Sequence, residues 1–116
     1  MNGANENNFV NNVASGNGAQ GILIADGSLN QLKSYTTSGN GENGIGIFAR
    51  QNTVKDNTAS GNGTGIRLAN GALENSVKNN TTQNNLSFDL ADENVNCDNN
   101  AWMSNIFTTA SQSCIQ

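Results

Sequence analysis

A short motif recurs along the chain at an interval of about 22 residues, and this repeat restricts the possible folds more than any other feature. Four copies of the motif Gly-Ile-x-Ile/Leu begin, at steps of 23, 21 and 22 residues, at Gly21, Gly44, Gly65 and the degenerate Ser87. A second motif, Ser-Gly-Asn-Gly, runs in phase with the first and begins at Ser15, Ser38 and Ser60. One structural unit is therefore repeated several times in a chain long enough for a single small domain.

Each repeat alternates apolar and polar residues in segments that are too short for helices and are separated by Gly and Asn. One repeat cannot bury its apolar side alone, whereas stacked repeats form a continuous narrow core. We therefore expect an all-β parallel solenoid of about four to five coils, one domain over residues 1–116. The expected coils are approximately 8–31, 32–53, 54–76 and 77–101, with a capping coil at 102–116. Two inward columns are expected, one of Ile22, Ile45, Ile66 and Phe88 and one of Ile24, Ile47, Leu68 and Leu90.

The chain holds 24 Asn and no Pro, and both facts agree with a solenoid. Asn tolerates the left-handed backbone angles of sharp corners better than most residues. Stacked Asn side chains can also bond to the coils above and below, and strand backbones without Pro can all donate to a neighbour. We expect such a ladder at Asn12, Asn57, Asn80 and Asn105, with Tyr35 as the exception.

The combined pattern, apolar-x-x-Asn-x-small-x-Gly-Asn-Gly-x-Gly-Ile-x-Leu, resembles the repeat of right-handed parallel β-helix proteins. That pectate-lyase-like superfamily includes pectate lyases, polygalacturonases, uronan epimerases, phage tailspikes and periplasmic proteins of copper-site maturation. The segments 87–92, 97–102 and 105–107 are similar to the closing coil of secreted bacterial members. The resemblance covers roughly residues 8–115 and implies a single-stranded right-handed β-helix. It implies little about function, because the same coils carry lyases, hydrolases, epimerases and inert stalks.

Cys97 and Cys114 are the only cysteines and flank the expected last coil. An even count favours one disulfide, and two buried thiols are the alternative. With Trp102, a disulfide would close the end of the core, where a solenoid needs a cap. A disulfide agrees with a secreted, extracellular or periplasmic protein, although the first residues carry no signal-peptide pattern.

The repeat begins at Phe9 with no capping helix before it. Either the chain is the C-terminal piece of a longer β-helix, or another copy covers its open end by stacking or strand exchange. In both cases we expect the open N-terminal end to promote association.

The three lysines occupy one column, because each follows the apolar residue of its repeat: Lys33, Lys55 and Lys78. In a parallel stack they would point outward about 5 Å apart. Repeated cations at strand spacing suit an acidic polysaccharide, whereas a solvated face with lysines inherited by duplication is the alternative interpretation. A second outward column, Thr36, Thr58 and Thr81, is similar to the threonine faces of β-helical ice-binding proteins, but Thr is also a common outward strand residue.

Several functions are disfavoured by what the sequence lacks. Without His, most zinc sites and His-based catalysis are excluded, and Met1 and Met103 are too few to indicate copper handling. No apolar run is long enough for a membrane span, and a net charge of -4 disfavours nucleic-acid binding. The acids Asp26, Asp56, Asp89 and Asp92 form no evident calcium cluster beside a base, and we expect Asp89 to pair with Arg67 across neighbouring coils.

The sequence therefore predicts a structural or binding module without catalytic residues, metal or cofactor, which contacts an acidic glycan through Lys33, Lys55 and Lys78. The alternative is a fragment of a polysaccharide lyase or glycoside hydrolase whose active site lies in further coils upstream.

Overall fold

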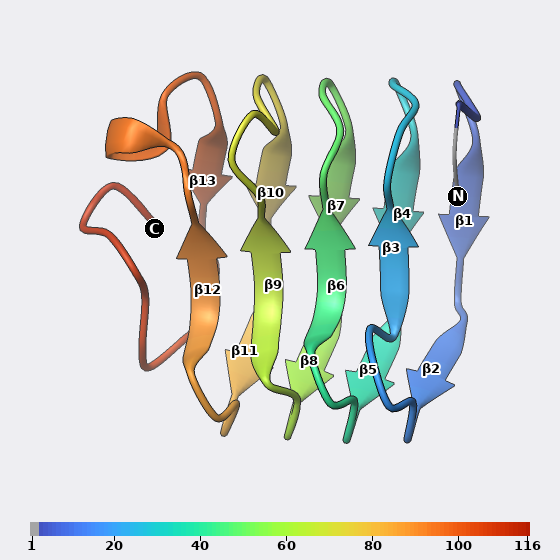
Figure 1. Ribbon diagram of the computed structural model, residues 1–116, viewed down its shortest axis with the longest axis vertical. Coiled ribbons are helices and arrows are strands. Elements are labelled where there is room, and N and C mark those ends of the chain that lie inside the picture. Colours follow the sequence, from blue (N-terminus) through green and yellow to red (C-terminus); the bar gives the residue numbers. More distant parts are fainter. Residues whose placement is uncertain (1–2) are drawn as a thin grey trace.

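The computed structural model describes residues 3–116 and consists of three parallel β-sheets wound into one solenoid (Figure 1). Sheet A contains, in spatial order, β1 (Asn8–Val10), β4 (Gln31–Lys33), β7 (Thr53–Lys55), β10 (Ser76–Lys78) and β13 (Ala101–Met103). Sheet B contains β2 (Val13–Ser15), β5 (Thr36–Ser38), β8 (Thr58–Ser60) and β11 (Thr81–Gln83). Sheet C contains β3 (Ile22–Ile24), β6 (Asn43–Ile47), β9 (Thr64–Leu68) and β12 (Phe88–Asp92).

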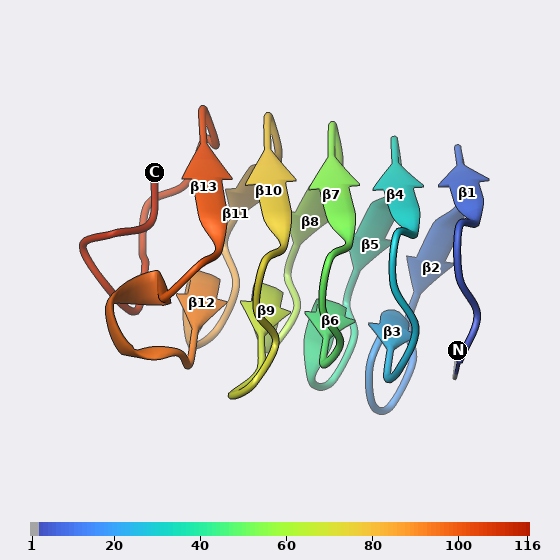
Figure 2. The same ribbon diagram turned by 90° about the horizontal axis from the view of Figure 1, so that it is seen from above.

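Each coil contributes one strand to each sheet, so strands that neighbour one another in a sheet come from successive coils (Figure 2). Corresponding ladder residues in neighbouring coils are 22 to 25 residues apart. The predicted parallel β-solenoid is confirmed. Within residues 3–116 the only helical element is the short 3-10 turn η1 (Val95–Cys97), and no helix there is long and apolar enough to cross a membrane.

The inward side chains of the three sheets stack in columns that fill the core. Sheet A supplies Phe9, Leu32, Val54, Val77 and Trp102. Sheet B supplies Ala14, Thr37, Ala59 and Thr82, and Phe107 of the cap also packs against the core. Sheet C supplies Ile22, Ile45, Ile66 and Leu90, and beside them Ile24, Ile47, Leu68 and Asp92. The first three repeats occupy their predicted columns.

The predicted register of the fourth repeat is wrong by two residues. Leu90, not Phe88, pairs with Ile66, and Phe88 pairs with Thr64 and is 39% exposed. The predicted register would have turned Asp89 outward. In the structure Asp89 is buried, because it serves as a hydrogen-bond acceptor inside the last coil.

The repeated Gly of the Gly-Ile motif is required by the close approach of successive coils. A Cβ atom added at Gly44 would lie 2.7 Å from the Asn62 side-chain nitrogen and 2.8 Å from the Gly65 carbonyl oxygen. Real Cβ atoms do not approach other atoms so closely, so a side chain here would push neighbouring coils apart. Gly at this position therefore fixes the strand of sheet C against the neighbouring Asn ladder.

The predicted Asn ladder is confirmed, and two further ladders accompany it. In the predicted ladder, the Asn12 amide donates to the Tyr35 hydroxyl, and Asn57 donates to Asn80. This ladder continues through Asn105, with the substitution at Tyr35 as expected. The second ladder consists of Asn7, Asn30, Asn52, Asn75 and Asn100, and the third of Asn17, Asn40, Asn62 and Asn85.

The residue before each ladder position has a positive φ, and this corrects the expected role of Asn at the corners. In the three-residue corner between sheets A and B these residues are Asn11, Ser34, Asp56, Asn79 and Ser104, with φ between 55° and 59°. Ser and Asp adopt this conformation here as well as Asn. Most of the buried Asn side chains instead stand one residue later, where they bond from coil to coil. The Asn richness therefore arises more from the ladders than from positive φ.

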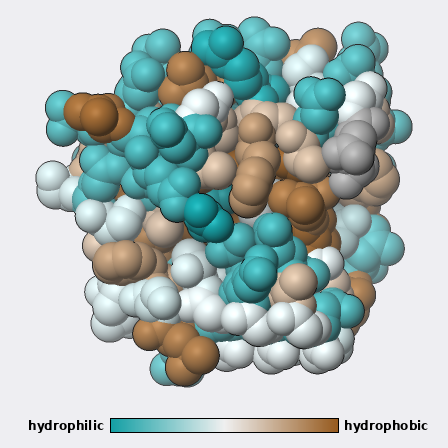
Figure 3. Space-filling view, viewed as in Figure 1, coloured by the Kyte–Doolittle hydropathy of each residue, from teal (hydrophilic) through white to brown (hydrophobic). Residues whose placement is uncertain are grey.

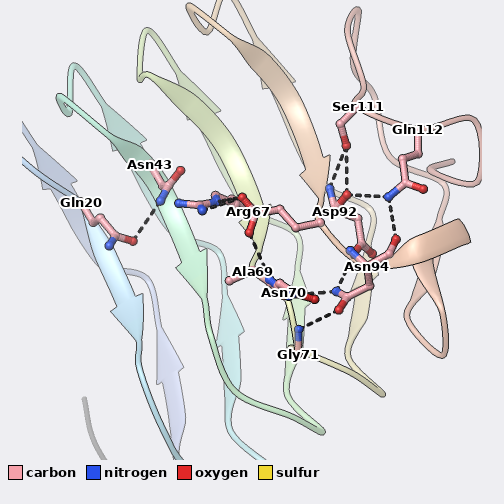
Figure 4. A network of polar contacts seen from close by, with 11 residues as sticks. Gln20, Asn43, Arg67, Ala69, Asn70, Gly71, Asp92, Asn94, Ser111 and Gln112 are labelled. Atoms are coloured by element: carbon pink, nitrogen blue, oxygen red, sulfur yellow. Dashed lines mark hydrogen bonds and ion pairs between the residues drawn. The ribbon is translucent and has the colours of Figure 1, made fainter.

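The C-terminal end of the solenoid is closed by the segment after β13. Cys97 and Cys114 form the predicted disulfide, and Trp102 is buried in the last position of the sheet A column. The Trp102 indole donates to Asp92, the carboxylate at the end of a sheet C column. Figure 4 shows how Ser111 and Gln112 of the returning chain meet the Asp92 backbone. This cap covers the end of the apolar core.

Candidate ligand-binding site

The outer face of sheet A carries the predicted lysine column. Lys33, Lys55 and Lys78 are the last residues of β4, β7 and β10 and pair directly with one another in the parallel register. Parallel strands lie about 4.8 Å apart, so the column presents one cation per coil along the solenoid axis. The three side chains are half-buried at their bases. The structure therefore places the three predicted residues in a single row.

No carboxylate in the described part of the chain lies within ion-pair distance of these three lysines. Both ion pairs found in residues 3–116 use arginines instead: Arg50 with Glu74 and Arg67 with Glu93. Asp56 follows Lys55 directly but stands at the corner, exposed and without an ion pair. Like charges opposite one another in a sheet are destabilising, so the lysine row is an unfavourable arrangement for stability alone.

A polar surface on sheet B adjoins the lysine column across the three-residue corner. Thr36, Thr58 and Thr81 point outward in register, and Ser38 and Ser60 form a parallel row beside them. The isolated bridge between Thr81 and Ile106 places Ile106 at the end of the threonine row, as predicted. A shallow hollow of about 230 Å³ lies over this surface and is lined by Thr58, Ser60, Thr81, Gln83 and Asn84. Cations and hydroxyl groups thus lie on adjoining faces.

The expected ion pair between Asp89 and Arg67 is wrong. Ala91 occupies the position next to Arg67 in the sheet, and the Arg67 Nε atom donates to Glu93 at 2.9 Å. The guanidinium group also lies 5.5 Å from the ring centre of Phe48, a cation–π distance. Figure 4 shows this arginine on the outer side of sheet C, and Figure 3 shows hydrophobic and hydrophilic residues mixed on the same face.

Asp89 instead ends the third Asn ladder. Its Oδ1 atom accepts hydrogen bonds from the backbone and side chain of Asn85, and its Oδ2 atom accepts from the backbones of Thr108 and Thr109. Burial by itself raises the pKa of Asp89, but the hydrogen bonds from Asn85, Thr108 and Thr109 outweigh it, so the pKa lies below its ordinary value. Asp89 therefore stabilises the cap as a carboxylate.

The acidic residues do not come together into a catalytic or metal site. Asp89 and Asp92 are buried in the cap, where hydrogen-bond donors occupy both oxygens of each. Asp56 stands at a corner beside the lysine column, and Asp26 lies on the loop between sheets C and A. No group of three His, Cys, Asp or Glu residues that could hold a metal ion is found within residues 3–116.

Two features of functional interest were missed by sequence reasoning. The carboxylates of Asp89 and Asp92 act as acceptors at the ladder ends, and the spacing of Asp89 after Asn85 was the available signal. The second feature is a hollow of about 420 Å³ over the loops between sheets C and A, lined in part by Asp26, Phe48 and Arg50. Its residues belong to corner loops whose composition varies from repeat to repeat.

Comparison with known proteins gives one match. The model of a protein family described as "Periplasmic copper-binding protein (NosD)" matches residues 1–113. No curated protein matches the chain significantly. No solved structure matches it either.

Proposed function

This chain belongs to the NosD family of periplasmic copper-binding proteins, and from this premise we propose that its periplasmic β-helix domain is a non-catalytic binding module that contacts an acidic polysaccharide through Lys33, Lys55 and Lys78. The observation that carries the proposal is the row of three cations in direct register with no carboxylate partner in the described part of the chain. The chain has only five basic residues, and three of them stand in this row.

A polyanion with regularly spaced carboxylates fits this row because it relieves the repulsion between neighbouring lysines. Each lysine keeps its ammonium group at the end of a flexible stem, so the row can adapt to a flexible chain of sugars. The hydroxyl groups of Thr36 and Thr58 lie next to the row and provide hydrogen-bonding partners for sugar hydroxyls. Binding of this kind is electrostatic and exposed, so it weakens as salt is added.

A copper site does not fit the residues that the structure describes. Copper sites in proteins use imidazole, thiolate and thioether ligands. The chain has no His, and both cysteines are joined in a disulfide. Met103 stands alone in the outer row of sheet A, next to Lys78, and Met1 lies outside the described residues. We therefore assign no copper-dependent step to this chain.

The test is titration calorimetry of the protein with polygalacturonate at low and at physiological salt. We expect the combined change Lys33→Ala, Lys55→Ala and Lys78→Ala to weaken binding at least about tenfold, equivalent to about 1.4 kcal/mol. The wild-type affinity should fall with added salt, because the contacts are exposed.

A matched control separates the lysine row from net charge. The combined change Asn70→Asp, Asn84→Asp and Asn99→Asp also makes the chain more negative by three charges, at exposed positions whose side chains make no hydrogen bond in the structure. We expect this control to bind polygalacturonate nearly as well as the wild type. Equal losses in the two triple variants, or no loss in the lysine variant, would show that the row is not the binding site.

A further inference from the structure

The N-terminal face of the solenoid is open, in contrast to the capped C-terminal face. The first-coil strands β1, β2 and β3 each pair on one edge only, with β4, β5 and β6. An apolar hollow of about 180 Å³ lies at this end, with Phe9, Ile22, Ile24 and Leu32 among its lining residues. Phe9 and Ile22 remain half-buried, whereas their column neighbours Leu32 and Ile45 are fully buried. Figure 3 shows hydrophobic residues at the surface in the region of β3.

The Asn ladders give this open face a definite polarity. Along every ladder, the amide of one coil donates to the side-chain oxygen of the next coil toward the C-terminus, as Asn40 donates to Asn62 at 2.8 Å. The side-chain oxygens therefore all face the N-terminal end. Those of the first coil, on Asn7, Asn12 and Asn17, accept no hydrogen bond from the described residues. This face thus presents three unused acceptors around an apolar hollow.

The backbone of the first coil shows what would pair with it. The Gln31 and Thr36 N–H groups donate to the carbonyl oxygens of Asn7 and Asn12, one coil earlier. In the same register, the N–H groups of Asn8 and Val13 point toward the open side. A parallel coil would supply carbonyl oxygens for these groups and amide donors for the three side-chain oxygens.

The C-terminal face of a second copy cannot supply these donors, because its cap already occupies them. The Asn85 amide is accepted by Asp89, the Asn100 amide by Asp92 and the Asn105 amide by the Gln116 carbonyl. Two N-terminal faces are also a poor match, because their ladder oxygens would face one another without donors. The hydrogen-bond pattern therefore argues against both forms of stacking between copies of this chain.

We propose that the N-terminal face is a docking surface for one further coil of the same repeat, joined ahead of residue 3 in a longer form of this polypeptide. The coil brings amide donors at the three ladder positions and an apolar side chain over Phe9 and over Ile22. The face selects its occupant by this donor pattern, and the carboxylate-lined cap makes growth of the solenoid possible at this end alone.

The experiment replaces residues 1–7 with a copy of residues 52–75, which carries Asn52, Asn57 and Asn62 at the ladder positions. The control has the same added coil with these three copied residues changed to Ala. Hydrogen exchange of the Asn8 and Val13 amides is compared in the two fusions and in the 116-residue chain. We expect at least tenfold slower exchange in the Asn fusion and most of that protection to be absent in the Ala fusion.

Two further measurements test the choice of occupant. We expect sedimentation to show the 116-residue chain as a monomer, and we expect the protein from its source cells to have a mass above the 12.1 kDa of this chain. Equal exchange rates in the two fusions would overturn the donor rule. A dimer that protects Asn8 and Val13, or a native mass of 12.1 kDa, would overturn the assignment to a preceding coil.

Discussion

Substitution of Asp89 by Asn tests whether a carboxylate is required to close the solenoid. The change keeps the size and shape of the side chain and removes one acceptor oxygen. The carboxylate accepts two hydrogen bonds from Asn85 and one each from the Thr108 and Thr109 backbones. An amide in the same place retains one of these donor pairs and turns its own NH₂ group toward the other. Two buried donors then lose their acceptor.

The expected cost follows from the number of bonds lost. Each buried donor left without a partner costs about 1–3 kcal/mol. The neutral amide is easier to bury than the carboxylate, which offsets part of this cost, so we expect a net loss of about 2–4 kcal/mol. In a domain of this size that loss corresponds to a fall in Tm of about 10–20 °C.

The assay is thermal unfolding at pH 7 followed by circular dichroism, with Asp56→Asn as the control. Asp56 is exposed, and the structure shows no hydrogen bond to its side chain, so the control makes the same chemical change without disturbing the cap. We expect it to alter stability by less than about 0.5 kcal/mol. Equal melting temperatures for the two variants would refute the role assigned to the Asp89 carboxylate.

The pH dependence gives an independent check. The folded-state pKa of Asp89 is below its ordinary value, so its stabilising contribution is fully present above that value and is lost as pH falls through the folded-state pKa. The stability difference between wild type and Asp89→Asn should therefore be largest at neutral pH and shrink below about pH 4. A difference that stays constant from pH 7 to pH 2 would contradict this assignment.

Two further predictions concern the ladders and the disulfide. Changing Asn57 to Ala removes a fully buried amide that bonds to Tyr35, Asn80 and the backbone, and should cost about 2–4 kcal/mol in urea unfolding, whereas the exposed Asn70→Ala should cost less than about 0.5 kcal/mol; similar costs would show that the ladder contributes little. Changing Cys97 and Cys114 together to Ser opens a 17-residue loop and should cost about 2–4 kcal/mol, measured by urea unfolding beside reduced wild type; an unchanged unfolding midpoint would be inconsistent with this estimate.

The repeat made most of the fold predictable, because each coil solves the same packing problem as its neighbours. The interval between motifs set the length of one coil, and apolar residues at matching positions, such as Leu32 and Val54, identified the inward columns. The ladder through Asn57 and Asn80 was predictable for the same reason. A side chain that bonds to its own counterpart one coil away must recur at the same place in the sequence.

The prediction failed where the repeat stops. Ser87 was aligned with Gly65, but one additional residue separates Asn85 from the following strand, and only the pairing of Leu90 with Ile66 reveals the true register. The returning segment after Thr108 has no counterpart in earlier coils. Its contacts with Asp89 depend on a long-range arrangement that no local pattern encodes.

The lysine column and the ladders are related to the repeat in opposite ways, and this difference bears on function. Duplication places an Asn beside its own copy, and the two amides stabilise one another because an amide is both donor and acceptor. Duplication also places Lys55 beside Lys78, but two cations repel and gain nothing from the same register. Acidic residues occur nearby, as Asp56 does, yet none in the described chain forms an ion pair with the column. A repulsive row left unneutralised inside an acidic protein is best accounted for by an external anion, and for this reason the lysine variants are the most informative test of function.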